Sequence, residues 1–236
     1  KNCSVTGNVT GGAVTGGLVG YNTGSIWNCS FSGVTTGSQK AGGLAGNNAG
    51  LMTGSASGGA VSGDSHVGGL SGSNTGTIRS CYSTAAVTGL ADLGGLVGTN
   101  SGSVLDCYAR GSVAGGQCIG GLVGQNHMYI ARCYSTGAVT GSGGLGGLVG
   151  CADAVTAGTW NSFWDRDSAG VQTSSGGTGV NHTQMLDVTT FTGAGWDFTG
   201  ETANGTTDLW MMPANGYPDL TMILNVPLPR APATRS

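Results

Sequence analysis

The chain has 236 residues, and 49 of them are glycine, about three times the usual share of roughly 7%. Charged residues make up 8%, against about 25% in an average protein, and the formal net charge is −3. A nucleic-acid-binding surface is excluded, because phosphate recognition needs clustered Lys and Arg. Collagen and a membrane-spanning helix are excluded as well, since glycine does not recur at every third position and no run of about 18 apolar residues exists.

A glycine-rich block, Gly-Gly-Leu-Val-Gly or a close variant, recurs six times at a spacing of 26 residues. The blocks start at Gly16, Gly42, Gly68, Gly94, Gly120 and Gly146. So strict a period indicates stacked units that pack only on their neighbours. Glycine costs about 1 kcal/mol per interior helix position relative to Ala, whereas the intervening Val, Ile, Thr and Tyr suit strands. We therefore predict an all-β fold, a parallel β-helix (β-solenoid) of about six 26-residue coils over residues 1–150.

Three columns of the repeat keep one residue type, so stacking turns each column into a ladder of like side chains. They are the Leu ladder (Leu18, Leu44, Leu70, Leu96, Leu122, Leu148), the Asn ladder (Asn22, Asn48, Asn74, Asn100, Asn126) and the Cys ladder (Cys3, Cys29, Cys81, Cys107, Cys133). We expect the Leu ladder to be buried beside the Cys ladder and an Ile-rich column. Leu93 and Val97 have the opposite parity to Leu96 but are apolar too, so either a corner intervenes or that face is covered.

We expect the Asn side chains to hydrogen-bond from coil to coil, as in cross-β stacks, with a ligand-binding role as the alternative. For the Cys ladder, stacked thiols lie within bonding range, but their Cβ vectors point the same way, which opposes disulfide geometry. We therefore favour buried free thiols. Bridges between neighbours and a metal site are the alternatives. Cys118 and Cys151 lie in different columns and coils, so we do not expect them to pair.

The period decays after residue 150, and four of the five Trp lie between residues 160 and 210. A terminal coil exposes unpaired strand edges and an apolar interior, so a solenoid needs a distinct cap. We predict that residues 151–224 form this aromatic-rich C-terminal cap and cover the last coil. Residues 225–236 contain three Pro and are predicted to form an extended tail, because Pro cannot continue a strand ladder.

Groups that could carry catalysis are sparse. Asp64, Asp92, Asp106 and Asp153 occupy four different columns, so the repeat enforces no pair of carboxylates of the kind that glycosidases need. The acidic group at residues 165–167 is interpreted as a charged cap loop, with a weak calcium site as the alternative. We expect no enzymatic activity, no cofactor and no metal.

Asn-x-Ser/Thr sequons supply candidate glycosylation sites. They begin at Asn2, Asn8, Asn28, Asn181 and Asn204. Asn2 and Asn28 share a column next to the Cys ladder, so both are expected to face solvent.

The Gly-Gly-Leu-Val-Gly block followed by x-Asn-x-Gly resembles the GLUG-motif repeats of bacterial cell-surface proteins, over about residues 1–165. Segments 160–165, 196–198 and 217–220 are similar to the ends of such arrays. In that family the repeats occur beside adhesin-like and immunoglobulin A peptidase domains. The resemblance implies an extracellular, cell-surface solenoid and brings no catalytic residues with it.

The leading hypothesis is a non-catalytic extracellular structural or adhesion protein. The alternative is a glycan-binding or glycan-active module (lyase-like or hydrolase-like) of a larger surface protein. We also expect head-to-tail self-association, because the first coil leaves an open edge near Val5, Val9 and Val14. The cap and tail of one subunit would cover the open coil of the next and build a filament. In the competing interpretation the chain is a fragment of a longer array.

Overall fold

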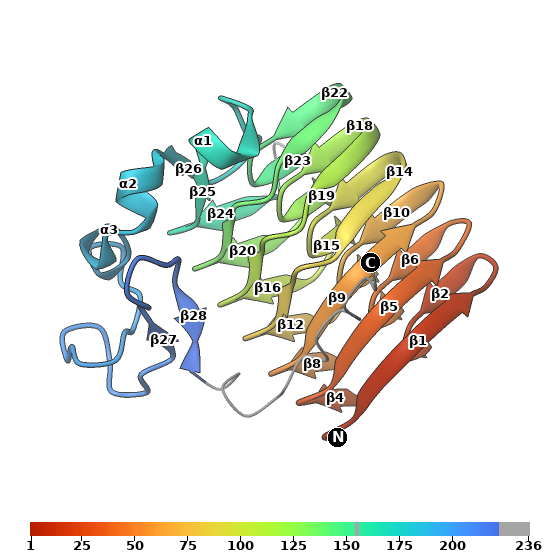
Figure 1. The fold of residues 1–236 in the computed structure, drawn as a ribbon, viewed down its shortest axis with the longest axis horizontal. Coiled ribbons are helices and arrows are strands. Elements are labelled where there is room, and N and C mark those ends of the chain that lie inside the picture. Colours follow the sequence, from red (N-terminus) through yellow and green to blue (C-terminus); the bar gives the residue numbers. More distant parts are fainter. Residues whose placement is uncertain (154–155, 222–236) are drawn as a thin grey trace, which may run out of the picture.

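The chain folds as a parallel β-solenoid, as the repeat predicts (Figure 1). The computed structural model describes residues 1–153 and 156–221. The 26-residue period reappears as strand register, so Ile78 pairs with Met52 on one side and Val104 on the other. Predicted tail residues 225–236 and the last three residues of the predicted cap lie outside the described range.

Within the described residues, two sheets of six parallel strands form two walls of the solenoid. The first follows the glycine blocks and contains β3 (Val19–Asn22), β7 (Ala45–Asn48), β11 (Ser71–Asn74), β15 (Val97–Asn100), β19 (Val123–Asn126) and β23 (Val149–Ala152). The second contains β4 (Ser25–Trp27), β8 (Leu51–Thr53), β12 (Thr77–Arg79), β16 (Ser103–Leu105), β20 (Tyr129–Ala131) and β24 (Gly158–Trp160).

The remaining strands of the solenoid join a third, fourteen-stranded sheet in the described part of the chain. It contains β1 (Ser4–Thr10), β2 (Val14–Gly16), β5 (Ser30–Thr36), β6 (Lys40–Gly42), β9 (Ala56–Ser62), β10 (Ser65–Gly68), β13 (Tyr82–Ser83), β14 (Ala86–Gly94), β17 (Tyr108–Ala109), β18 (Val113–Gly120), β21 (Tyr134–Ser135), β22 (Val139–Gly146), β25 (Phe163–Asp165) and β26 (Thr178–Val180).

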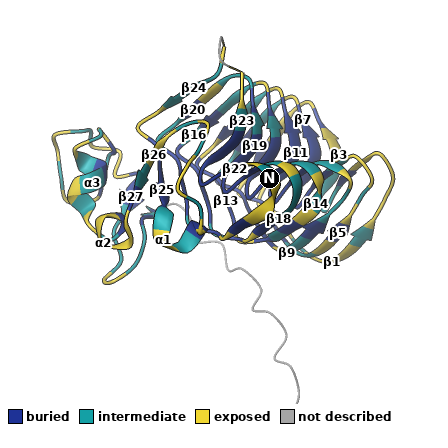
Figure 2. Cartoon of the chain, turned by 90° about the horizontal axis from the view of Figure 1, so that it is seen from above, coloured by how far each residue is buried: buried dark blue, intermediate teal, exposed yellow. Residues whose placement is uncertain are grey.

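The C-terminal region adds short helices and one antiparallel strand pair. The helices are α1 (Arg166–Ala169), α2 (His182–Met185) and α3 (Val188–Thr192), and β27 (Trp210–Met211) pairs with β28 (Asp219–Leu220). Figure 2 shows buried residues inside the solenoid walls and exposed residues along the rims and on the outer side of this region.

A sharp corner at each glycine pair explains why apolar residues that would lie on opposite faces of one strand are all buried. Leu93, Leu96 and Val97 are all fully buried. Leu96 and Val97 pack in the cluster that holds the Cys ladder, whereas Leu93 packs in a second cluster. The corner needs glycine because a Cβ on Gly94 would collide with the carbonyl oxygen of Val97. The chain therefore encloses two separate apolar interiors.

The aromatic side chains of the C-terminal region pack in two places. Trp164 packs on the last coil, in the cluster that contains Leu148 and Val149. Most of the others cover the side of the solenoid, over a column of stacked rings in which Tyr108 lies 4.9 Å from Tyr82 and 5.0 Å from Tyr134. Trp196 and Trp210 contact Tyr134 in this cluster. The last coil is continued by residues 173–178, whose backbone bonds to that of Gly147, Val149 and Ser162.

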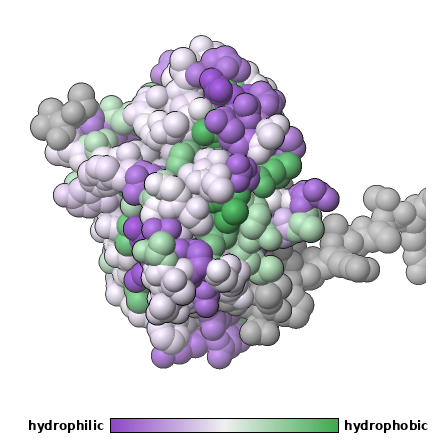
Figure 3. Space-filling model, turned by 90° about the vertical axis from the view of Figure 1, so that its left-hand side faces the viewer, coloured by the Kyte–Doolittle hydropathy of each residue, from purple (hydrophilic) through white to green (hydrophobic). Residues whose placement is uncertain are grey.

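Arg110 anchors the C-terminal region to this tyrosine column. Its guanidinium donates to Asp219 at 2.7 Å, to the hydroxyl of Tyr134 at 2.6 Å and to the carbonyl of Pro218 at 3.0 Å. It also lies over the ring of Tyr108. Viewed from the side of the C-terminal region, the surface shows apolar side chains gathered in a narrow band between polar ones (Figure 3).

Candidate functional site

The structure places the Leu and Asn ladders inside the solenoid. Leu44, Leu70, Leu96, Leu122 and Leu148 are fully buried, while Leu18, in the first coil, is half-buried. In the Asn ladder, the Nδ2 of each Asn except Asn126 donates to the Oδ1 of the Asn in the next coil, over 2.6 to 2.8 Å. Asn126 donates instead to the carbonyl of Met128. The other side-chain amides also donate to backbone carbonyls, so their hydrogen bonds are made within the solenoid and connect its coils.

The Cys ladder consists of free thiols. Cys29, Cys81, Cys107 and Cys133 are buried, and Cys3 is exposed. Burial in the apolar interior raises the pKa of the Cys107 thiol, and its neighbours Cys133 and Cys81 raise this pKa further. This environment favours the uncharged thiol, which packs as a small apolar group.

The expectation that Cys118 and Cys151 do not pair is wrong: they form a disulfide, with Cα atoms 5.1 Å apart. Their positions in the 26-residue repeat put the two cysteines in different columns, but the chain reverses its direction at the glycine corner. The reversal lays β23 against β18, so a Cβ on Gly150 would meet the backbone of Cys118. Cys118 adopts a left-handed conformation, with φ of 51°, two residues before that corner. Residues from different columns thus become neighbours across the corner.

Four of the five sequon asparagines are exposed. They are Asn2, Asn8, Asn28 and Asn181. Asn181 also caps α2, since its side chain accepts from the backbone N–H of Gln184. Asn204 differs because its Nδ2 donates to the carbonyl of Thr192 at 2.8 Å, so this amide has a structural role.

The acidic group at residues 165–167 is not a loop, because it spans the end of β25 and the first turn of α1, with Asp165 as the N-cap of that helix. The fully buried Asp165 accepts hydrogen bonds from Tyr217 at 2.7 Å and from two backbone N–H groups of α1, and it lies 2.9 Å from the ring of His182. Burial alone would raise the pKa of Asp165, but these hydrogen bonds outweigh it and hold the pKa below its ordinary value. Within the described residues, no cluster of three or more His, Cys, Asp or Glu is arranged to hold a metal ion.

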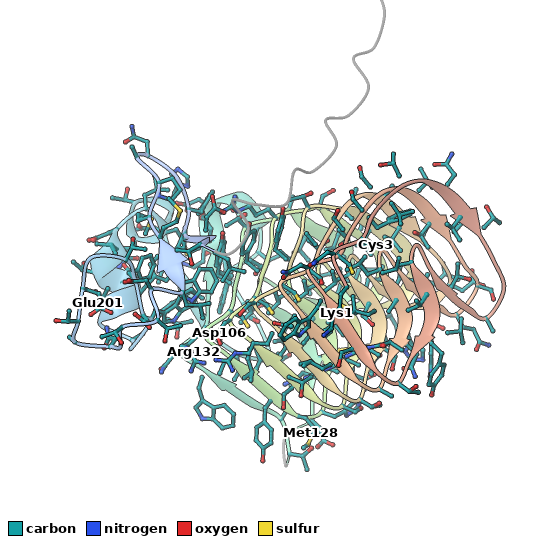
Figure 4. All side chains as sticks on the ribbon, turned by 90° about the horizontal axis from the view of Figure 1, so that it is seen from below. Lys1, Cys3, Asp106, Met128, Arg132 and Glu201 are labelled. Carbon is teal, nitrogen blue, oxygen red and sulfur yellow. A yellow bond between two sulfur atoms is a disulfide. The ribbon has the colours of Figure 1, made fainter. Side chains whose placement is uncertain are left out.

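The best candidate site is a polar cavity of about 460 Å³ between the solenoid and the C-terminal region, here called the junction groove. Its volume falls in the range of about 300–1,000 Å³ typical of small-molecule sites. The solenoid side is lined by Thr53, Arg79, Ser80, Asp106 and Arg132, and the opposite side by Gly195, Asp197, Asn204, Thr207, Leu209 and Trp210. Figure 4 shows Asp106 and Arg132 side by side on the flank of the solenoid that faces the C-terminal region.

The solenoid side of the groove is built on a left-handed corner that repeats in every coil. The corner residues are Asn2, Asn28, Gly54, Ser80, Asp106 and Arg132, all with φ between 49° and 59°. Asn, Asp and Gly adopt this conformation most readily. Arg132 has no such preference, so its ion pair with Asp106 offsets a local strain. The 26-residue spacing places this Arg directly after Asp106 in the column.

A buried carboxylate holds the two arginines of the groove. Arg132 donates through Nε to Asp106 Oδ1 at 2.6 Å and through Nη2 to Oδ2 at 3.0 Å. Arg79 Nε lies 3.5 Å from the same Oδ2. The Asp106 side chain is fully buried, whereas those of Arg79 and Arg132 are 56% and 35% exposed. The buried Asp106 carboxylate therefore holds both arginines in place, and their side chains remain partly exposed to solvent.

Two residues that line the opposite side of the groove each have a buried polar atom without a partner among the described residues. Trp210 Nε1 and Asp197 Oδ1 are buried, and neither has a hydrogen-bond partner among the described residues. The other carboxylate oxygen of Asp197 accepts from the backbone N–H of Thr207 at 3.0 Å. A buried polar group without a partner costs about 1–3 kcal/mol, so the groove stores unmet hydrogen-bonding capacity.

Sequence reasoning missed this groove. The sequence pattern is interpreted with Asp106 as one of four acids in different columns. Arg132, however, lies one period after Asp106 and must stack beside it. Two opposite charges one period apart are a readable signal for an ion pair between coils. Asp197 and Trp210 carry no such signal, because they lie outside the repeat.

The comparisons with known proteins agree with the repeat. The family model of the GLUG motif matches residues 63–88, a segment that runs from just before β10 into β14. Searches of curated proteins and of solved structures each found no match. In the described part of the chain, no helix has the length and apolar character required to cross a bilayer. The matched segment is one of six in-register units with the same glycine block and parallel pairing, and the match supports the resemblance of this repeat to the GLUG motif.

Proposed function

We propose that this chain is a non-catalytic adhesion module of the cell exterior that binds glycans in the junction groove. The observation that carries the proposal is the pair of unpartnered buried atoms, Trp210 Nε1 and Asp197 Oδ1, in a groove that also presents two arginines. One atom is a donor and the other an acceptor. Hydroxyl groups suit both kinds of atom, because a hydroxyl donates one hydrogen bond and accepts others. Sugars carry several such groups on one ring.

The charge of the groove favours a neutral glycan. Arg79 and Arg132 are balanced by Asp106 and Asp197, so the lining has no net charge. An acidic sugar would gain from the arginines but would face the free carboxylate oxygen of Asp197. A neutral sugar can donate to that oxygen and accept from the guanidinium groups.

The arrangement of the two carboxylates supports binding over hydrolysis. Glycosidases use one carboxyl group as a proton donor and a second as a base or nucleophile. Asp106 accepts two hydrogen bonds from Arg132 and faces a second guanidinium, so it serves the ion pair. This leaves Asp197 as the carboxylate with free hydrogen-bonding capacity in the groove.

The disulfide supports the extracellular part of the proposal. Disulfides persist in oxidising compartments and are rare where thiols are kept reduced. The Cys118–Cys151 bridge joins neighbouring coils, and four other cysteines remain as buried thiols. Pairing is therefore restricted to one site by geometry.

Calorimetric titration with neutral cello-, xylo- and manno-oligosaccharides of two to six units tests the proposal. We expect at least one series to bind, and Arg79→Ala to weaken that binding about tenfold, equivalent to about 1.4 kcal/mol. Arg79 is largely exposed, so this variant is expected to keep its fold. Arg166→Ala, which removes an arginine outside the groove, is the matched control and should bind as the wild type does.

Two outcomes would overturn the proposal. If none of the three series binds at millimolar concentration, the groove is not a neutral-glycan site. If the bound oligosaccharide is recovered in shortened form after prolonged incubation, the module is catalytic.

A further inference from the structure

Two exposed tryptophans flank the solenoid side of the junction groove. One outward column of the second sheet reads, in register, Trp27, Thr53, Arg79, Leu105, Ala131 and Trp160. Thr53 and Arg79 line the groove, and Ala131 precedes the groove residue Arg132. The column therefore runs past the groove and ends on a Trp at each side.

The exposure of these two rings sets them apart. Trp27 and Trp160 are 45% and 50% exposed, whereas Trp164, Trp196 and Trp210 are buried. Trp160 stacks on Tyr129, itself 47% exposed, with ring centroids 5.5 Å apart. A structural role explains part of this arrangement, because the ring of Trp160 fills the space above Gly158. Half of the ring nevertheless remains open to solvent.

The spacing of the column suits an extended ligand. Adjacent strands lie about 4.8 Å apart, so the five steps from Trp27 to Trp160 span about 24 Å. Within the column, the residues between the two Trp are short or aliphatic apart from Arg79, which leaves a straight path along the solenoid axis. Pyranose rings have an apolar face of C–H groups that packs on aromatic rings, and their hydroxyls point sideways.

We infer that the junction groove is the centre of a longer site, in which a linear neutral polysaccharide runs along the solenoid axis and stacks sugar units on Trp27 and Trp160. This inference rests on the proposed function and names its ligand as a chain rather than a terminal sugar. The groove residues bind hydroxyls at the centre. The two rings hold units at either end, where the polar lining of the groove stops.

The test compares dimers with hexamers of the oligosaccharide series that binds the wild type. We expect the hexamer to bind about tenfold more tightly than the dimer, as stacking at the ends of the site contributes only to the longer ligand. Trp27→Ala and Trp160→Ala should each reduce hexamer affinity and leave dimer affinity unchanged. Trp160→Gln is a second variant, whose side chain still covers Gly158 without an aromatic ring.

Tyr21→Ala is the matched control. Tyr21 is 62% exposed and lies on β3, in a different wall of the solenoid, so its loss should change neither affinity. If the dimer and hexamer bind equally, or if the Trp variants bind the hexamer as the wild type does, the extended site is wrong and the groove alone is the site. If neither length binds in any series, the proposed function fails together with it.

Discussion

At the scale of single residues, the interior of a solenoid makes large demands on side-chain volume. Leu96 is fully buried in a central coil, between Leu70 and Leu122 of the same ladder. Leu96→Ala is expected to lower the free energy of unfolding by about 2–5 kcal/mol, because it removes buried apolar surface and leaves a cavity. Urea denaturation followed by circular dichroism measures the loss.

Leu18→Ala supplies the control for that substitution. Leu18 has the same place in the repeat but is half-buried, since no coil covers its other side in the described chain. Its truncation should cost less than that of Leu96. Equal losses would show that burial within the ladder does not govern stability.

How far a residue's role could be predicted depends on whether its neighbours are one period away. The Leu and Asn ladders and the free thiols of the Cys ladder follow from the repeat alone. The disulfide does not, because Cys118 meets Cys151 across a corner and not within a column. The ion pair of Asp106 with Arg132 lies one period apart and was predictable in principle. The free Nε1 of Trp210 was not, since its surroundings come from segments without a repeat.

At the scale of elements, the repeat predicts the walls of the solenoid but not what packs against them. The parity of Leu93 and Val97 leaves a corner and a covered face as alternatives, and the structure selects the corner by burying the two residues in different clusters. The C-terminal region is predicted to cover the last coil, and Trp164 packs there, but most of its aromatic side chains cover the tyrosine column on the side. Composition indicates that such rings are buried, but it does not specify the face that they bury.

Asp165 joins several elements of the C-terminal region. It ends β25, caps α1, lies beside the His182 ring at the start of α2 and accepts from the Tyr217 hydroxyl. The pKa of Asp165 is held below its ordinary value of 3.8. A carboxyl group with a lowered pKa stabilises the fold above its unfolded-state pKa, and this contribution is lost as the pH falls through the lower folded-state value.

The acid stability of the fold should therefore depend on this carboxylate. In a series from about pH 6 to about pH 2, the wild type should lose stability progressively below about pH 4, because the Asp165 carboxylate is protonated there. Asp165→Asn should be less stable at pH 6 and show a shallower acid decline, measured by urea denaturation at each pH. Parallel pH curves for the two proteins would contradict a role of this carboxylate.

At the scale of the whole molecule, the two ends of the described solenoid differ. The first coil leaves β1 to β4 with parallel partners on one side only, and Val5 and Val9 pack at the open end of the core. At the other end, residues 173–178 continue the backbone bonding of the last coil. A contact between these unlike ends would be heterologous, and such contacts extend into filaments when they do not close into rings.

The final prediction is that the isolated chain self-associates through its first coil. An open parallel edge over an apolar interior is a template for another chain, so at roughly micromolar concentration a contact worth about 8 kcal/mol would be half formed. Val9→Lys places a charge at the open end of the core and should yield monomers in sedimentation velocity. Val34→Lys adds the same charge at a 41% exposed position of the second coil, away from the open edge, and should associate as the wild type does. A wild type that sediments as a monomer at this concentration would exclude the filament and leave a module that acts as a single rod.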